Sequence, residues 1–380
     1  MKTLYLHIGT PKTGTSSIQT FLRKNKEQLA GYNYSYPLFS FKYPDIPRQR
    51  NGYFLTLGKK FLANSETGEP NAEWKEHYAA ALERIHQEFE HCDNLILSEE
   101  TLWHTICDDP KGFLRTLPED AKENHYQIKI IVYLRRQDLF LTSLWNQKVK
   151  VGKTGQSLSD YLYSLQEERP FYADYNATLH LVADLIGKEN MIVRRFEPSF
   201  WVNHSICADF LAAIGLNHSL PFDYQEDTVN LSLKGNAVEI QRLINSMNDL
   251  STREKRDFSQ YTRAFSVSPE NTAPTPHLST KKTADLLARY QEGNNRVAKE
   301  FFNDGFPLFS DEIMVQPDWK PDYEALLSDT MHYFLTIVQD LNQQNSELSR
   351  EISDLKQEKK TVRHSLYDLK KKIGSKILKK

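Results

Sequence analysis

The sequence predicts an α/β protein, a three-layer parallel β-sheet with helices on both faces, followed by a long C-terminal helix. In roughly the first half of the chain, short apolar runs alternate with helical patterns, which favours a parallel sheet covered on both sides. The run at 128–134 is continuously apolar, as in a strand buried on both faces. A seven-residue apolar repeat after residue 331 predicts the C-terminal helix.

Five segments have the character of strands: Leu4–Ile8, a short one at Tyr34–Tyr36, Leu95–Leu97, Ile128–Leu134 and Met191–Phe196. Helical spacing of apolar residues is present in Ser16–Leu29, Trp74–Glu90, Leu139–Lys150, Tyr175–Ile186, Ile206–Ile214, Ser232–Met247 and Thr280–Phe302. Residues 250–278 are polar and contain three prolines, so a long loop is expected there. Further prolines at 307, 317 and 321 predict a domain boundary, with one domain at 1–322 and the C-terminal helix at 323–380.

Composition excludes several classes of protein. The 380 residues are 39% hydrophobic and 26% charged, and a net charge of −2 gives no overall attraction to nucleic acid. Three widely spaced cysteines argue against a disulfide framework or a zinc site and are typical of a reducing compartment. The first strand begins too early for a signal peptide, and no apolar run reaches the ~18 residues of a membrane span. We therefore expect a cytoplasmic protein.

The first loop has the pattern of an anion-binding turn. Strand, hydroxyl-rich turn and helix follow one another through Gly9, Thr10, Pro11, Lys12, Thr13, Gly14, Thr15, Ser16 and Ser17. In a strand–turn–helix segment, backbone N–H groups and the positive end of the helix dipole can face a bound anion. In the nucleotide-binding pattern G-x-x-x-x-G-K-[ST] the lysine follows the second glycine, but here Thr15 holds that position and the lysine is Lys12. A nucleotide kinase is therefore disfavoured, and an ordinary βα turn is the alternative.

A second pattern follows the buried strand 128–134. Arg135 ends that strand, and Ser143 lies eight positions later in the next helical segment. A guanidinium offers paired donors to a phosphate, and a hydroxyl near a helix start adds another.

Together the two patterns resemble the phosphosulfate loop and the 3′-phosphate signature of sulfotransferases that use 3′-phosphoadenosine 5′-phosphosulfate (PAPS). The chain is similar to a bacterial group of these enzymes over about residues 1–315. Four segments contribute to the resemblance: Leu95–Glu100, Arg135–Asp138, Asn230–Ser232 and Asn295–Ala298. Better-known relatives have Asn-Pro after the first arginine where this chain has Arg136-Gln137, which leaves open which arginine holds the phosphate; the spacing favours Arg135.

The resemblance implies the roles of the site residues. PAPS would be the donor, with no metal, held by Pro11 to Ser17, by Arg135 and Ser143, and by the Lys234-Gly235 pair. Lys12 would stabilise the departing 5′-phosphate. Glu100 is the first choice for the base that takes the acceptor's proton, and the alternatives are Glu99, His104 and His7. The acceptor implied by the relatives is a carbohydrate hydroxyl on a cell-surface glycan, its lipid-linked precursor or a glycolipid.

The C-terminal segment predicts assembly. Positions 331, 338, 345, 352, 359, 366 and 373 read Met, Val, Asn, Ile, Lys, Leu and Ile, and positions 334, 341, 348, 355, 362 and 369 read Phe, Leu, Leu, Leu, Val and Leu. This heptad pattern predicts a coiled coil and a homo-oligomer, dimer or trimer. The lysine-rich end at 370–380 predicts either a solvated terminus or a peripheral contact with the inner membrane face. A scaffold protein that keeps a nucleotide-binding core and acts through its coiled coil is the alternative function.

Overall fold

The computed structural model describes residues 1–41, 43, 46–57, 72–108, 117–225 and 231–377, and it does not describe the side chains of residues 57, 72–75 and 368–377. The chain divides into two compact units. The first comprises Met1–Ser232 and Pro276–Trp319, and the second comprises Leu233–Thr275 and Lys320–Lys380. Residues 233–275, which the sequence pattern assigned to the first domain, thus group with the C-terminal helix.

The first unit contains the predicted parallel sheet. Its strands are β1 (Lys2–His7), β2 (Tyr34–Ser35), β3 (Asn94–Ser98), β4 (Tyr126–Leu134) and β5 (Met191–Arg195). Their order is β2-β3-β1-β4-β5, and every neighbouring pair is parallel. All five predicted strands are confirmed, including the short one. Because the strands are parallel, their carboxyl ends lie at one edge of the sheet. Strands β2 and β3 lie on one side of β1, and β4 and β5 lie on the other.

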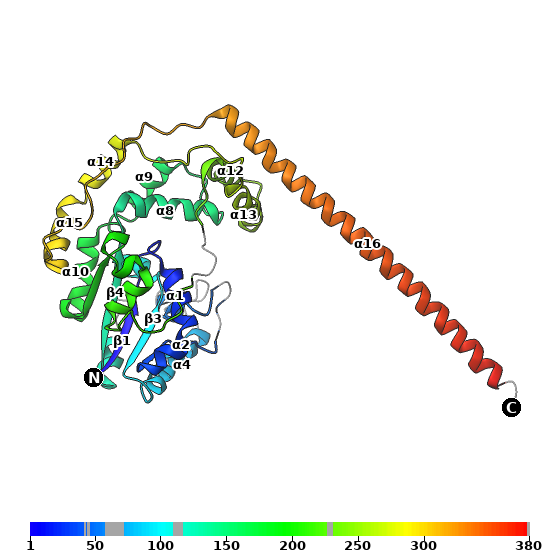
Figure 1. Ribbon diagram of the computed structural model, residues 1–380, viewed down its shortest axis with the longest axis horizontal. Coiled ribbons are helices and arrows are strands. Elements are labelled where there is room, and N and C mark those ends of the chain that lie inside the picture. The colour runs from blue at the N-terminus through cyan, green and yellow to red at the C-terminus, as the bar shows by residue number, and fades with distance from the viewer. Residues whose placement is uncertain (42, 44–45, 58–71, 109–116, 226–230, 378–380) are drawn as a thin grey trace. The chain divides into compact units, whose positions relative to one another are not determined.

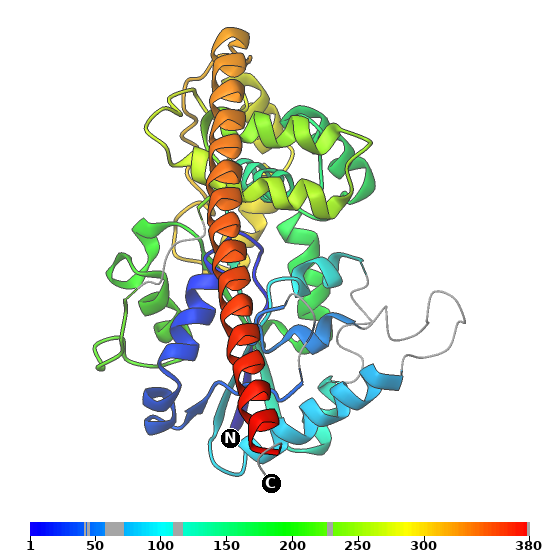
Figure 2. The same ribbon diagram turned by 90° about the vertical axis from the view of Figure 1, so that its right-hand side faces the viewer.

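Helices cover both faces of this sheet, as the alternation of side chains requires. Leu4 and Leu6 point to one face and Tyr5 and His7 to the other, and all four are buried. Figure 2 shows α1 and α2, in dark blue, on one side of the sheet and α4, in light blue, on the other. The three-layer α/β class is therefore confirmed.

The α-helices of the first unit are α1 (Thr15–Lys24), α2 (Lys26–Gly31), α4 (Ala72–Glu88), α5 (Leu102–Asp108), α7 (Leu117–Glu123), α8 (Gln137–Lys150), α9 (Leu158–Glu168), α10 (Tyr175–Ile186), α11 (Ile206–Ala213), α14 (Thr280–Ala288) and α15 (Gln291–Val297). Shorter turns are the 3-10 helices Tyr53–Leu57, Lys188–Asn190, Pro198–Phe200 and Val202–His204, and the π-helical turn Ala298–Phe302.

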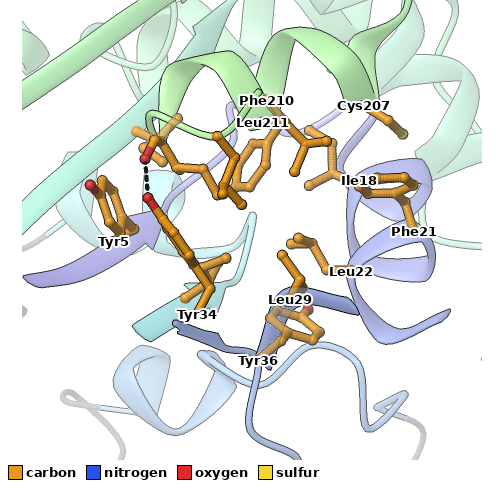
Figure 3. Close-up of a cluster of buried hydrophobic side chains, with 14 of the residues drawn as sticks. Tyr5, Ile18, Phe21, Leu22, Leu29, Tyr34, Tyr36, Cys207, Phe210 and Leu211 are labelled. Atoms are coloured by element: carbon orange, nitrogen blue, oxygen red, sulfur yellow. Dashed lines mark hydrogen bonds between the residues drawn. The ribbon is translucent and has the colours of Figure 1, made fainter. Parts of the chain in front are cut away.

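One hydrophobic core joins the sheet to α1, α2 and α11 (Figure 3). Ile18 and Leu22 of α1 and Phe210 of α11 are fully buried in it. Tyr34 of β2 donates its hydroxyl to the carbonyl oxygen of Ile214 at 2.7 Å, which ties the sheet edge to the end of α11. Since burying each such side chain contributes about 1.5–3 kcal/mol, this core holds α1 and the loop before it in place.

Two predicted helices are broken into shorter ones. The segment predicted at 16–29 is α1 followed by α2, because the buried Asn25 interrupts the helix. Its side-chain amide donates to the carbonyl oxygens of Phe21 and Asp223, at 3.0 and 2.9 Å, and so fixes a bend. The segment predicted at 280–302 is α14, α15 and the π-helical turn.

The prediction of a loop at 250–278 was wrong for the first half of that segment, which forms α13 (Thr252–Ser266). A capping box begins this helix: Ser251 accepts from the N–H of Glu254 at 3.2 Å, and Glu254 accepts from the N–H of Ser251 at 2.8 Å. Phe265 then packs in the core of the second unit. The helix is polar in composition but amphipathic, so its narrow apolar face was missed.

The second unit is helical and consists of α12 (Gly235–Ser246), α13 and α16 (Tyr323–Ile377). Its core contains Ile240, Ile244 and Phe265 together with Leu326, Tyr333 and Ile337 from the start of α16. The long C-terminal helix predicted from the heptads is therefore confirmed as a helix (Figure 1), and its association with other chains stays a prediction.

Candidate functional site

The first loop lies where the carboxyl ends of β1, β3 and β4 meet. The N–H and the hydroxyl of Thr10 both donate to the carbonyl oxygen of Tyr133, at 3.0 and 3.2 Å, and the N–H of Tyr133 donates to Gly9 at 2.7 Å. On the other side, a Cβ added at Gly9 would lie 3.3 Å from the carbonyl oxygen of Glu100. The loop after β1 is thus packed between the ends of β3 and β4, the edge at which α/β folds bind ligands.

The backbone of this loop turns through conformations that favour glycine. Gly9 and Gly14 have φ values of 102° and 72°, and Lys12 has a φ of 65°. A side chain at Gly14 would meet Phe196 at 3.2 Å and Ile206 at 3.4 Å. The turn delivers the chain into α1, whose first N–H groups, on Thr15, Ser16 and Ser17, have no partner within the helix.

The hydroxyls of the loop are not equivalent. Thr13 is fully buried and donates its hydroxyl to the carbonyl oxygen of Thr10, so it stabilises the turn. Pro11 and Thr15 are also buried, Ser17 is half-buried and Ser16 is exposed. The loop therefore offers N–H groups and the Ser16 and Ser17 hydroxyls to a ligand.

Lys12 lies among groups from three strand ends. Its ammonium donates to the side-chain oxygen of Gln147 at 3.3 Å, and its carbonyl oxygen accepts from Arg135 at 3.0 Å. Burial lowers the pKa of Lys12, the nearby Arg135 lowers it further, and Glu100 opposes both. Two cations held this close together favour an anion between them.

The two consecutive arginines have different surroundings. Arg136 pairs with both oxygens of Asp138, at 2.8 and 2.9 Å, and also donates to the carbonyl oxygens of Ser310 and Glu312. Arg135 stacks over Phe196 with 5.4 Å to the ring centroid, and among the described residues it has no carboxylate partner. The guanidinium with donors to spare is therefore that of Arg135.

Ser143 and Gln147 lie one turn apart on α8, and therefore on the same face of that helix. Gln147 contacts Lys12, so this face is turned toward the loop. Within the part of the chain that the structure describes, Ser143 makes no side-chain hydrogen bond, and it is half-buried. Gln147 was missed by the sequence analysis, although its spacing of four from Ser143 was a usable signal.

Two neighbouring carboxylates follow β3 and differ in access. Glu99 is fully buried and accepts two hydrogen bonds from Arg50 as well as one from the N–H of Thr101 at 2.9 Å. Burial raises the pKa of Glu99 to about 7, Glu100 adds to the rise, and Arg50 counteracts it. Because its oxygens already accept these bonds, Glu99 is not free to meet a substrate.

Glu100 is the accessible carboxylate, with 19% of its side chain exposed. One oxygen accepts from the amide of Gln19 at 3.0 Å, and the other lies 3.5 Å from the guanidinium of Arg50. Arg50 and Gln19 come from distant segments, so sequence spacing gave no signal for either. They hold the carboxylate at the edge where Lys12 lies.

The two histidines weighed as bases are both buried. His7 is fully buried, its Nδ1 lies 2.9 Å from the hydroxyl of Ser98, and burial lowers its pKa to about 3. His104 stacks on Tyr172, whose hydroxyl lies 2.8 Å from its Nε2. Burial and the nearby cations lower the pKa of His104 to about 3 as well. Both rings are therefore neutral near pH 7.

Positive charge gathers around α5 beside these carboxylates. Lys148, Lys153 and Arg169 all act on His104, and burial together with the other two cations lowers the pKa of Lys148. Arg169 has a partner in Asp108 at 3.5 Å, whereas Lys148 has no ion pair among the described residues. This cationic cluster, Lys148, Lys153 and Arg169, has more positive than negative charge.

The predicted pair Lys234-Gly235 lies in the second unit, at the start of α12. The N–H of Gly235 donates to Thr275 at 2.8 Å, and Asn271 accepts from the N–H of Asn236 at 3.1 Å. A side chain at Gly235 would clash with that of Asn271, so close packing explains the glycine.

Two further segments, Asn230–Ser232 and Asn295–Ala298, contributed to the resemblance, and the structure describes only part of the first. Asn230 lies outside the described residues. Next to the Asn295–Ala298 segment, Asn294 exchanges hydrogen bonds with Gln137 at 2.8 and 3.1 Å, which joins α15 to the start of α8.

Among the described residues no group of three or more His, Cys, Asp or Glu side chains is placed to hold a metal ion. None of the described helices has both the length and the apolarity needed to cross a bilayer.

No family model matches the chain. An uncharacterized protein of Archaeoglobus fulgidus is 26% identical over 187 residues, which is 49% of this chain and 49% of the relative, so the chain spans about half the length of the curated relative it matches. A crystal structure of a sulfotransferase from Alicyclobacillus acidocaldarius aligns with 60% of this chain and 86% of its own, at 16% identity and a TM-score of 0.38.

Proposed function

We propose that the protein transfers a sulfuryl group from PAPS to a hydroxyl of an acceptor. The observation that supports this most is the meeting of Lys12, Arg135 and Glu100 at the carboxyl edge of one parallel sheet, after β1, β4 and β3 respectively. Two cations and a turn rich in N–H groups suit a donor with an anionic group at each end, and a carboxylate beside them suits proton removal.

The donor would be held at both of its phosphate ends. Arg135, with donors to spare, and Ser143 on the facing helix are the proposed partners of the 3′-phosphate. The N–H groups at the start of α1, the hydroxyls of Ser16 and Ser17, and Lys12 would surround the 5′-phosphosulfate. Pro11, Thr13 and Gly14 would act through the shape of the turn, and Lys234 and Gly235 stay proposed partners of the 3′-phosphate.

In the transfer step the bond between sulfur and the 5′-phosphate oxygen breaks as a new bond forms from sulfur to the acceptor oxygen, by analogy with phosphoryl transfer. Lys12 would stabilise the charge left on the departing phosphate. Glu100 would take the acceptor's proton, since it is accessible and Glu99 is occupied by Arg50. His7 and His104 would serve as packing and hydrogen-bonding residues.

The proposed acceptor is a carbohydrate hydroxyl, as the resemblance of the sequence implies. The proposed location of the reaction is the cytoplasm. The cationic cluster supports an acidic acceptor, one with a carboxylate, phosphate or sulfate near the reacting hydroxyl. Lys148 is half-buried without an ion pair among the described residues and close to two other cations, so an anionic group would relieve their repulsion.

Isothermal titration calorimetry tests the donor assignment. The desulfonated product, 3′-phosphoadenosine 5′-phosphate, should bind the full-length protein at least ten-fold more tightly than AMP. Arg135→Ala should remove most of this preference, because it deletes the proposed contact with the 3′-phosphate. Arg136→Ala is the matched variant and should keep the preference, since Arg136 is already engaged by Asp138.

Equal binding of AMP and of the 3′-phosphorylated nucleotide would overturn the proposed donor. Loss of the preference in Arg136→Ala but not in Arg135→Ala would move the 3′-phosphate to Arg136.

A further inference from the structure

The start of α16 uses one of its faces inside the chain. Leu326, Tyr333 and Ile337 are buried against α12 and α13, and the hydroxyl of Tyr333 donates to the carbonyl oxygen of Phe258 at 3.2 Å. Farther along, Tyr261 of α13 donates to Asp340 at 3.1 Å. This packed face ends near residue 340, although the helix continues to Ile377.

A second face of the same helix is apolar and uncovered. Its members share the a and d positions of the heptad pattern, and their exposed fractions range from 44% to 64%: Met331, Phe334, Val338, Leu341, Leu348, Ile352, Leu355, Val362 and Leu366. Isolated exposed apolar residues are ordinary, but a long apolar stripe along a helix, interrupted here at Asn345 and Lys359, is a mark of an interaction surface. We call this set the seam.

The seam and the packed face are geometrically distinct. A straight α-helix turns about 100° per residue, so the seam residues between 331 and 341 lie about 100° around the axis from Leu326, Tyr333 and Ile337. The first turns of α16 can therefore pack on α12 and α13 while the seam stays open to another helix. Over 55 residues the helix is about 80 Å long. Among its described side chains beyond Leu341, the large exposed apolar ones belong to the seam, except Tyr367.

The charges beside the seam point to its occupant. The g positions before Ile352 and Lys359 are Glu351 and Glu358, and the e positions after Leu355 and Val362 are Lys356 and Arg363. In a parallel coiled coil the g residue of one heptad lies beside the e residue of the next heptad on the partner, so Glu351 would face Lys356 and Glu358 would face Arg363.

We propose that the seam binds the seam of a second copy of this chain, in parallel and in register. An antiparallel pair would place g beside g and e beside e, and so acid against acid and base against base. Asn345 and Lys359 at a positions favour the same arrangement, because each would meet its own counterpart only when the helices are in register. This inference does not depend on the chemistry proposed for the first unit.

Charge reversal in the full-length protein tests both the partner and the orientation. The double variant Glu351→Lys/Glu358→Lys and the double variant Lys356→Glu/Arg363→Glu should each raise the self-dissociation constant at least ten-fold, because both place like charges together. Mixing the two variants should restore a complex that contains one chain of each kind. Analytical ultracentrifugation, with a distinct fluorescent label on each variant, measures both results.

A matched control is Glu347→Lys/Asp354→Lys, which makes the same change in net charge at the outward c positions of two heptads. This control should assemble like the unaltered protein. Monomeric unaltered protein at tens of micromolar would overturn the proposal, and so would charge-reversed variants that assemble like the control. A complex that forms with the same dissociation constant in all variants would exclude the parallel arrangement.

Discussion

Arg50 contacts two carboxylates at the candidate site. It forms a two-point hydrogen-bonded pair with the buried Glu99 and lies 3.5 Å from Glu100, while only 16% of its side chain is exposed. Removing one partner of a buried ion pair leaves an uncompensated charge and typically costs about 3–5 kcal/mol. The stability of the first unit should therefore depend on Arg50.

The loss in Arg50→Ala should depend on pH. Because the pKa of Glu99 is raised to about 7 in the folded protein, its contribution to stability is complete below the ordinary value near 4.5 and is lost as pH rises through about 7. Arg50 limits this loss, so the free energy of unfolding should fall more in Arg50→Ala at pH 8 than at pH 5. Urea denaturation at the two pH values measures it, and Arg48→Ala, at an exposed position, is the control. An equal loss at both pH values would contradict this account of the pair.

Glu100 is the residue on which the proposed proton transfer depends. Glu100→Gln keeps the shape and the hydrogen bond from Gln19 but removes the base, so turnover should fall ~10²–10⁴-fold while the nucleotide product binds with unchanged affinity. Initial rates with radiolabelled PAPS and calorimetry measure the two quantities. The exposed Glu123→Gln should leave both unchanged. Turnover retained in Glu100→Gln and lost in His104→Ala would instead assign the base to His104.

The turn between β1 and α1 depends on Gly14. Its φ of 72° is strained for other residues, and a Cβ there would lie 3.2 Å from Phe196. Gly14→Ala should therefore destabilise the protein by about 1–2 kcal/mol from the backbone alone and weaken nucleotide binding, because the N–H groups after it are displaced.

Gly31→Ala is the matched control for this loop variant. Gly31 ends α2, has nothing within 4 Å of an added Cβ, and should tolerate alanine. Thermal unfolding and calorimetry compare the two variants. If Gly14→Ala bound the nucleotide as the unaltered protein does, the turn would not be the phosphate-binding element.

At the scale of the whole molecule, α16 has two separable roles that truncation can distinguish. A chain ending at Asn342 keeps Leu326, Tyr333 and Ile337, so the second unit should stay folded while self-association is lost. A chain ending at Asp322 also loses these three side chains, each worth about 1.5–3 kcal/mol of burial, and the second unit should unfold. Limited proteolysis within 233–275 and light scattering measure the two effects. Equal protease resistance of both truncated chains would show that α16 is not needed for that core.

Local pattern was enough to predict the elements whose signal is contained in one stretch of sequence. The apolar runs 4–8 and 128–134 predicted buried strands, because a strand covered on both faces of a parallel sheet has apolar residues on both of its sides. The heptads after 331 predicted a long helix, because a seven-residue apolar repeat matches two turns of an α-helix. Lys12 and Arg135 could be named as candidates because Lys12 lies in the turn after one strand and Arg135 directly follows another, and parallel strands end at one edge.

Tertiary structure alone decided which side chains meet at that edge. Arg50 and Gln147 come from segments far from Glu99 and Lys12 in sequence, and no spacing rule brings them together. Arg135 and Arg136 look alike as a sequence, and they differ only because Asp138 and two carbonyl groups from 310–312 satisfy Arg136. Access likewise separated Glu100 from Glu99, because burial depends on what the rest of the chain places over a carboxylate, and sequence periodicity does not report that.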